Sequence, residues 1–233
     1  MGKPEIYRLP LGGCNCYLVR QEGLILIDTG TPNQRETFRR TLERISVSPR
    51  DISLIILTHA HNDHTGSGAD IKEITGAPVA INRHEQESMD QVPMVLPPGI
   101  GPVGKVMTAL LSRVMPLLGK LTGSATDSPA CPIDLVLDEE EFTLMPFGVE
   151  GKILHTPGHT AGSMSVLLDT GEALVGDLAM SFLPSWLGSP MPLLGDDPET
   201  IKRSWRLLLD NGARWIYPAH GKAFSADVLR KAL

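Results

Sequence analysis

The stretch LTHAHNDHTG, residues 57–66, places three histidines and one aspartate within six positions. His59 and His61 lie two residues apart, so on an extended chain their side chains point to the same side, whereas the adjacent Asp63 and His64 diverge and can serve a second centre. Three imidazoles and a carboxylate suit Zn, Fe, Mn or Co, but not Ca or Mg. A solvent-exposed polar turn is the alternative, but this density of histidine favours a transition-metal site.

The composition is that of an ordinary soluble globular protein. The 233 residues are 42% hydrophobic and 21% charged, which is enough to bury a substantial core. A formal net charge of -6 disfavours the backbone of a nucleic acid as the main partner. No run of roughly 18 apolar residues predicts a membrane span. The three cysteines are an odd number and indicate no disulfide framework, so we expect a cytoplasmic protein.

The histidine-rich stretch follows a short apolar run. Residues Leu54 to Leu57 are all apolar, which is typical of a strand that is buried on both faces. After the histidines, Ser67 can cap a short helix that Gly76 ends. The histidines therefore lie in the turn that leaves the carboxyl end of a strand, where ligand sites of open α/β sheets gather.

The rest of the chain alternates between strands and helices. Further strands are expected at 14–20, 23–28, 78–81, 133–137, 142–145, 149–154, 163–168, 172–176 and 214–217. Further helices are expected at 33–45, 198–210 and from Ser225. Clusters of strands separated by helices predict the α/β class, with two packed sheets and helices outside them. Nothing resembles a linker, so we expect one domain over residues 1–233, with an apolar helical insertion at about 92–126.

Three later turns supply further metal donors. ILHTPGHT, residues 153–160, contains His155 and His159, ALVGDLAM, residues 173–180, contains Asp177, and WIYPAHGK, residues 215–222, contains His220. Each of these turns follows an apolar strand, so all of them could converge on one edge of the sheets.

The order of these motifs carries a resemblance to a known family. The motifs H-x-H-x-D-H, T-P-G-H-T, G-D and P-A-H-G occur in that order, and NCYLV and LIDTG precede them. Over essentially its whole length the chain resembles the metallo-β-lactamase superfamily. The resemblance implies a four-layered αβ/βα sandwich of two mixed sheets with outer helices, and a dinuclear metal site in the groove between the sheets.

The resemblance also implies how two divalent metal ions are held, with Zn as the leading metal and Fe or Mn as alternatives. It implies that one ion is bound by His59, His61 and His159. The other ion is bound by Asp63, His64 and His220, and Asp177 bridges the two. Two such cations can share a water and lower its pKa from 15.7 toward about 7, which supplies a metal-bound hydroxide. Asp63 and Asp177 are therefore the expected catalytic residues, and no protein nucleophile is required.

Four other residues near the motifs invite a metal role but are expected to have another. Pro157 and Gly158 exclude the helix that would pair His155 with His159, and the family pattern assigns the ligand to the second histidine. His155 is then a supporting residue that can orient a ligand. Asp28 of LIDTG is expected to hydrogen-bond the turn near the site. Cys14 and Cys16 could be a thiol pair for a metal, but the strand pattern and the family segment NCYLV favour packing.

Two apolar segments distinguish this chain. Within residues 92–126, apolar residues from Val103 to Met115 recur at helical spacing, and Pro116 is expected to break the run. A second, proline-rich segment at 178–195 follows Asp177. Both segments could cover the core, form a homodimer or bind substrate. In the last case the substrate-binding residues are Met107, Met180 and Trp186.

We therefore expect a dinuclear metal hydrolase for a small-molecule ester, lactone or thioester with a hydrophobic acyl or aryl group. Acyl-homoserine-lactone lactonases carry a tyrosine at the position of Met180, which sets this chain apart from them. One alternative is a mononuclear iron oxygenase of the persulfide-dioxygenase kind. Another is a metal-dependent binding protein without catalysis. Neither a nucleic acid nor a membrane span is expected.

Overall fold

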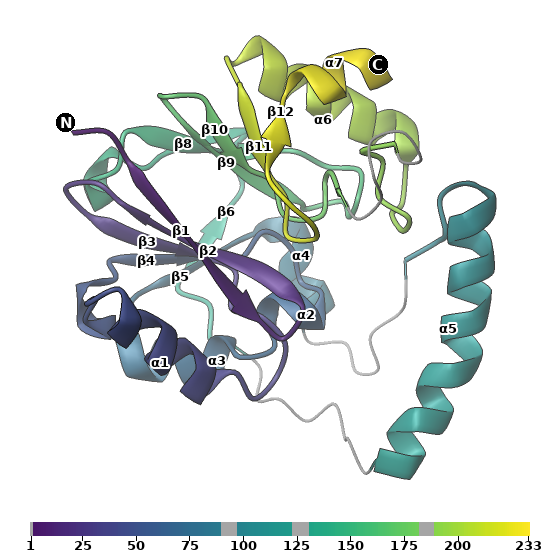
Figure 1. Cartoon of the computed structure of the whole chain (residues 1–233), viewed down its shortest axis with the longest axis horizontal. Helices are drawn as coiled ribbons and strands as arrows, with labels where there is room; N and C mark the ends of the chain where they lie inside the picture. Colours follow the sequence, from purple (N-terminus) through teal and green to yellow (C-terminus); the bar gives the residue numbers. More distant parts are fainter. Residues whose placement is uncertain (1, 90–96, 123–130, 182–188) are drawn as a thin grey trace.

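The computed structural model describes residues 2–89, 97–122, 131–181 and 189–233, with only the backbone described at 87–89 and 115–122. These residues form two six-stranded sheets that stack on each other (Figure 1). The first sheet has the order β1(Glu5–Leu11), β2(Cys14–Arg20), β3(Leu24–Ile27), β4(Leu54–Ile56), β5(Val79–Asn82) and β6(Leu135–Leu137). The second has the order β12(Phe224–Ser225), β11(Trp215–Tyr217), β10(Glu172–Leu174), β9(Met164–Leu168), β8(Gly151–His155) and β7(Glu141–Thr143).

Both sheets are mixed. In the first, β1, β2 and β3 pair antiparallel, whereas β3, β4, β5 and β6 pair parallel. In the second, β10 and β11 form a parallel pair among antiparallel neighbours. The parallel strands need helical crossovers, and those helices lie on the outer faces of the sheets.

Helices lie outside both sheets (Figure 1). The first sheet is covered by α1(Arg35–Arg44) and α3(Gly68–Thr75), and the second by α6(Pro198–Asp210) and α7(Asp227–Ala232). The other described helices are α2(Asn62–Thr65), α4(Arg83–Met89), α5(Gly101–Thr122) and the two 3-10 turns η1(Pro49–Asp51) and η2(Met145–Phe147). The expected four-layered αβ/βα sandwich is confirmed.

Three apolar clusters hold the layers together. The middle cluster lies between the sheets and joins residues such as Ile56 of β4 to Val166 of β9. An outer cluster packs Phe38 of α1 against the first sheet, and the other packs Trp205 of α6 against the second. Because apolar side chains leave both faces of each sheet, the central strands are buried throughout, as the unbroken apolar run of β4 predicts.

Two local features of the first sheet and its helices differ from what the sequence indicates. The edge strand β1 was not predicted, because Pro10 interrupts its apolar pattern; an edge strand tolerates this residue, since one side of it makes no ladder hydrogen bonds. Ser67 precedes α3 and Gly76 ends it in a left-handed conformation, but the Ser67 side chain does not cap the helix. Its hydroxyl instead donates to Thr31 O at 2.7 Å and accepts from Gln34 N at 2.8 Å.

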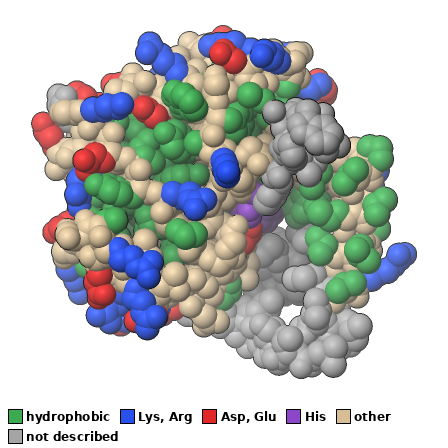
Figure 2. Space-filling model, in the orientation of Figure 1, with side chains coloured by type: hydrophobic (Ala, Val, Ile, Leu, Met, Phe, Trp, Pro, Cys, Tyr) green, Lys and Arg blue, Asp and Glu red, His purple; other side chains and the backbone are tan. Residues whose placement is uncertain are grey.

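Within residues 92–126, the described part contains one long helix, α5, which lies beside the sandwich and not in its layers (Figure 1). Pro116 does not break this helix, since α5 continues to Thr122. A proline removes one backbone hydrogen bond from a helix, and the turns on either side of it can still form. Apolar side chains are displayed along α5 (Figure 2), and Val103, Val106 and Leu110 are 66%, 69% and 59% exposed. In the described chain, no helix has the length and apolar character that crossing a membrane requires.

Candidate metal centre

The turns that leave four strands converge at one end of the sandwich. The turn after β4 carries the histidine-rich stretch, and the turn after β8 carries His159. Asp177 follows β10, and His220 follows β11. All seven sequence-predicted ligands fall into two compact groups of possible metal donors, joined by contacts of Asp177.

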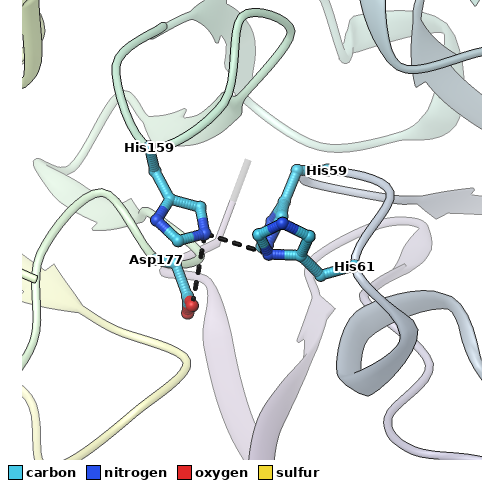
Figure 3. A group of neighbouring side chains, drawn as sticks. All are labelled: His59, His61, His159 and Asp177. Atoms are coloured by element: carbon cyan, nitrogen blue, oxygen red, sulfur yellow. Dashed lines mark hydrogen bonds and ion pairs between the residues drawn. The ribbon is translucent and has the colours of Figure 1, made fainter. Parts of the chain in front are cut away.

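The first group contains His59, His61, His159 and Asp177, whose side chains point toward one another (Figure 3). Nδ1 of His61 lies 2.9 Å from Nε2 of His59 and 3.1 Å from Nε2 of His159. Two nitrogens bound to one tetrahedral Zn at about 2.0–2.1 Å would lie roughly 3.3 Å apart. The spacing of these imidazoles is therefore close to that of a metal's coordination shell.

The second group contains Asp63, His64 and His220. Oδ2 of Asp63 lies 3.1 Å from Nε2 of His220 and 3.7 Å from Nε2 of His64. His64 is fully buried, whereas 38% of the Asp63 side chain is exposed. This group therefore extends from the interior of the sandwich to its surface.

Asp177 lies between the two groups. Its Oδ1 is 3.4 Å from Nε2 of His64 and 3.4 Å from Nε2 of His220. Its Oδ2 is 3.6 Å from Nε2 of His159. Each oxygen of this buried carboxylate thus faces a different group, which is the arrangement that a bridging ligand requires.

Two buried atoms at the centre indicate that the residues fit a metal. Among the described residues, Nε2 of His64 and Oδ1 of Asp177 are buried side-chain atoms without a hydrogen-bond partner. Leaving such atoms unpartnered costs about 1–3 kcal/mol each. A cation between them would satisfy both, and imidazole with carboxylate is a donor set that Zn, Fe and Mn accept.

Asp28 sets the orientation of His64. Oδ2 of Asp28 lies 2.8 Å from Nδ1 of His64, while its Oδ1 accepts a hydrogen bond from Thr58 N at 2.8 Å. A proton on Nδ1 that is donated to this carboxylate leaves the Nε2 lone pair free for a metal. The expectation that Asp28 hydrogen-bonds the turn is confirmed. Its backbone has a φ of 62°, a left-handed conformation that aspartate tolerates better than most residues.

The electrostatics of the first group suit metal binding. Burial, followed by the other imidazoles, lowers the pKa of His59 well below its ordinary value. Burial and His159 lower the pKa of His61 to about 4. Burial by itself would raise the pKa of Asp177, but the imidazoles of His64, His159 and His220 outweigh it and hold that pKa well below the usual range. At neutral pH His59 and His61 are therefore neutral imidazoles and Asp177 is a carboxylate, the forms that bind metals.

His155, which is expected to support a ligand and not to be one, lies outside both groups. Nε2 of His155 lies 2.9 Å from the carbonyl oxygen of Ala161, and its ring stacks on that of His84 with centroids 5.9 Å apart. His155 therefore supports the loop that carries His159. The four-residue spacing between the two histidines spans a turn and not a helix.

Cys14 lies closer to the centre than the sequence indicates. Its Sγ is 3.9 Å from Nδ1 of His64, and together with Asp28 and His64 it forms a third group of possible donors. The neighbouring Cys16 thiol and burial raise the pKa of Cys14 well above its usual value. A thiol that stays protonated is a poor metal ligand, so the contact agrees with the packing role.

The strand that carries both cysteines also holds the His220 turn, a role that the sequence did not reveal. Nδ2 of Asn15 donates to Gly221 O at 2.8 Å, and the Tyr17 hydroxyl donates to Pro218 O at 2.7 Å. Both residues belong to the NCYLV segment. The sign of this role in the sequence is that Asn15 and Tyr17 carry polar groups in a strand that is expected to be buried. The first sheet therefore fixes a donor that the second sheet supplies.

The base of α5 is connected to the centre. Ile100 N, next to the start of the helix, donates to Leu193 O at 2.8 Å, and Leu194 O lies 2.9 Å from Nδ1 of His159. One short segment thus anchors the helix and orients a histidine. Of the predicted substrate-binding residues, Met107 and Met180 are half-buried, and Trp186 lies outside the described residues.

Comparison with known proteins gives a consistent picture. The family model described as the metallo-beta-lactamase superfamily matches residues 9–220. The probable metallo-hydrolase MJ0888 of Methanocaldococcus jannaschii is 28% identical over 208 residues, which cover 89% of this chain and 87% of that protein. An N-acyl homoserine lactonase of a Bacillus species is 26% identical, and the match covers 85% of this chain and 76% of that protein.

Solved structures share the fold. The crystal structure of the B3 metallo-beta-lactamase BLEG-1 superposes with a TM-score of 0.71 at 22% identity and covers 97% of both chains. A crystal structure of TTHA1623 in a di-iron-bound form superposes with a TM-score of 0.64 at 24% identity, covering 99% of this chain and 98% of that one. At these identities the superpositions show the fold.

Proposed function

The chain belongs to the metallo-β-lactamase superfamily, and we propose that it is a hydrolase that uses two divalent metal ions to cleave an ester, lactone or thioester. The observation that carries this proposal is the position of Asp177, whose two oxygens face two separate donor groups. Zn is the proposed metal, with Fe or Mn as alternatives, because imidazole and carboxylate donors suit all three.

Each donor has a defined part in holding the metals. The three imidazoles of the first group would hold one ion, and Asp63, His64 and His220 would hold the other. Asp28 and the carbonyl of Leu194 orient His64 and His159 through their second ring nitrogens. When bound, the pair of ions supplies a hydroxide nucleophile at neutral pH and stabilises the developing oxyanion of the substrate.

Asp63 and Asp177 differ in exposure, which assigns them different tasks. The Asp177 side chain is 7% exposed and that of Asp63 is 38% exposed. We assign the buried Asp177 to holding the centre together. We assign the carboxylate of the more exposed Asp63 to holding the second ion and to accepting a hydrogen bond from the attacking hydroxide, which would orient it toward the substrate.

Two features support a substrate with a hydrophobic acyl or aryl group. The exposed apolar side chains of α5 lie on a helix whose base is bonded to the segment that orients His159. The similarity to an N-acyl homoserine lactonase supports a carbonyl substrate of this kind. Met180 lacks the hydroxyl of the tyrosine found at this position in such lactonases, so help to the leaving group must come from elsewhere.

Four further expectations stand as proposals. Three buried free cysteines support a reducing compartment such as the cytoplasm. Association of two chains through the exposed face of α5 stays a prediction, and so does the treatment of residues 92–126 as an insertion in a single domain. A small-molecule substrate is the proposed partner.

The test is metal analysis of the purified protein followed by a panel of ester, lactone, thioester and β-lactam substrates. We expect two ions per chain and turnover of at least one carbonyl substrate. One Fe per chain with oxygen consumption would instead indicate the mononuclear oxygenase. Metal binding without turnover of any substrate would indicate the metal-dependent binding protein.

A further inference from the structure

Glu85 is a buried carboxylate that contacts both loops of the first donor group. It lies in α4 and is 2% exposed. Its Oε2 accepts a hydrogen bond from Ala60 N at 2.8 Å, and its Oε1 accepts one from Gly162 N at 2.8 Å. The two oxygens of one side chain thus bind the backbones of two segments that are far apart in sequence.

Both backbone donors lie beside metal-donor residues. Ala60 stands between His59 and His61 in the turn after β4, and Gly162 follows His159 by three residues in the turn after β8. β4 belongs to the first sheet and β8 to the second. Glu85 therefore connects the loop that supplies a pair of imidazoles from one sheet to the loop that supplies a single imidazole from the other.

The surroundings of Glu85 hold it in this position. Oδ1 of the buried Asn82, at the end of β5, accepts a hydrogen bond from His84 N at 2.9 Å and so supports the first turn of α4. On the other side, a Cβ added to Gly162 would lie 2.7 Å from Cγ and 2.8 Å from Oε1 of Glu85. Glycine is thus required for the carboxylate to approach this loop.

The choice of a carboxylate at this position has a chemical reason. In the described part of the chain, Glu85 forms no ion pair with a lysine, arginine or histidine within 4.0 Å, so its charge is satisfied by backbone N–H groups. Such charge-assisted hydrogen bonds are about twice as strong as neutral ones. A glutamine has one carbonyl oxygen and one NH2 group, and it could accept from only one of the two loops in this geometry.

We propose that Glu85 is a positioning residue that sets the spacing of His59 and His61 relative to His159, and with it the affinity of the first donor group for a metal. The proposal rests on the metal site of the proposed function but not on the reaction or its substrate. Loss of a partner that orients metal ligands commonly lowers metal affinity by 10–100-fold. A comparable loss is expected here, because two ligand loops are released together.

The first experiment compares the Zn affinity of the full chain and of Glu85→Gln by competition with a chromogenic chelator. Asp134→Asn is the matched control, because Asp134 also accepts a backbone hydrogen bond, from Val79 N at 2.7 Å, at the opposite end of β5. We expect at least a tenfold loss of affinity for Glu85→Gln and a change of less than twofold for the control, even where both lower the melting temperature.

The second experiment approaches the same contact from the other side. Gly162→Ala keeps the charge of Glu85 but displaces it, so its loss of metal affinity should not add to that of Glu85→Gln in the double variant. Backbone amide NMR of the metal-free protein gives an independent readout. The signal of Ala60 should shift in both variants and that of Gly162 should shift in Glu85→Gln, and both signals should stay in place in Asp134→Asn.

The outcomes of these experiments test the positioning role of Glu85 separately from the proposed hydrolase function. Folded Glu85→Gln with unchanged Zn affinity, or fully additive losses in the double variant, would overturn the positioning role. If Glu85→Gln does not fold, Gly162→Ala and its amide shifts decide the question alone. A wild-type chain that binds no metal would contradict the proposed function, and the NMR shifts of the metal-free protein would still show whether Glu85 holds the two loops.

Discussion

Oδ2 of Asp28 lies 2.8 Å from Nδ1 of His64, and both side chains are buried at the centre of the donor cluster. A carboxylate accepts a hydrogen bond from a protonated Nδ1, and it therefore favours a metal-binding lone pair on Nε2. Nε2 faces Asp177 and has no hydrogen-bond partner among the described residues. The protonation of Nδ1 of His64 thus links Asp28, which follows β3, to the metal site.

Asp28→Asn should therefore weaken the second donor group. The amide would present an NH2 group to Nδ1, which favours a proton on Nε2 and blocks the lone pair that faces the site. We expect Zn affinity at one of the two sites to fall by about 10–100-fold. Chelator competition and elemental analysis measure this loss, with Asp134→Asn as the control. Two tightly held ions in Asp28→Asn would show that the orientation of His64 is set elsewhere.

Asp177→Ala should remove the connection between the two donor groups. We expect loss of at least one ion per chain and at least a hundredfold fall in kcat/KM, while circular dichroism shows the wild-type fold. The two oxygens of Asp177 face both groups, so no neighbouring side chain can replace them. The bridging role fails if the variant retains both ions and its activity.

The pH dependence of activity should report on the attacking water. Ionisation of a water shared by two metal ions falls near pH 7, so kcat should rise with pH through an apparent pKa of roughly 6 to 8. Replacing Zn with another divalent metal should move that pKa, because each metal acidifies water differently. Profiles measured with two metals check this expectation, and a rate independent of both pH and metal would contradict it.

Trp205 is expected to contribute both to the stability of the protein, through the packing of α6, and to the metal affinity of the site. Its fully buried indole donates to Leu178 O at 2.9 Å, and Leu178 is the residue after Asp177. Trp205→Ala should lower the free energy of unfolding by about 3–5 kcal/mol. Trp205→Phe retains most of the packing, so its main effect should be on metal affinity through the freed Leu178 carbonyl. Denaturant titration and chelator competition separate the two effects; a fully wild-type Zn affinity in Trp205→Phe would argue against the coupling.

Substrate chain length should test the part played by α5. Each buried methylene contributes up to about 0.8 kcal/mol, so kcat/KM should rise severalfold per pair of acyl carbons until the acyl chain extends beyond the apolar side chains of α5. Met107→Ala and Met180→Ala should flatten this trend without changing metal content, and Lys105→Ala on the same helix is the control. Equal kcat/KM for acetyl and octanoyl forms of one leaving group would return α5 to a purely structural role.

Local patterns in the sequence were enough to identify most of the strands and to point to the donors. The apolar run of β4 and the spacing of His59, His61, Asp63 and His64 follow from neighbours in the chain, because strand burial and side-chain direction repeat every two residues. The edge strand β1 escaped prediction because its burial is incomplete and a proline interrupts it. The continuation of α5 through Pro116 was also not expected. The low helix propensity of a proline is a local property, and the rest of a helix can override it.

The sequence by itself determined the α/β class, through apolar periodicity, and it supplied the seven candidate ligands through short motifs whose order resembles that of a known family. The tertiary structure alone decided how those ligands meet: which oxygen of Asp177 faces which group, that Asp28 orients His64, and that Glu85 joins Ala60 to Gly162. These relationships connect residues of different strands and loops; Glu85, for example, is 25 positions from Ala60 and 77 positions from Gly162. Their distances are set by the packing of two sheets, which no local pattern encodes, because hydrogen bonds of a few ångströms depend on the placement of every layer between them.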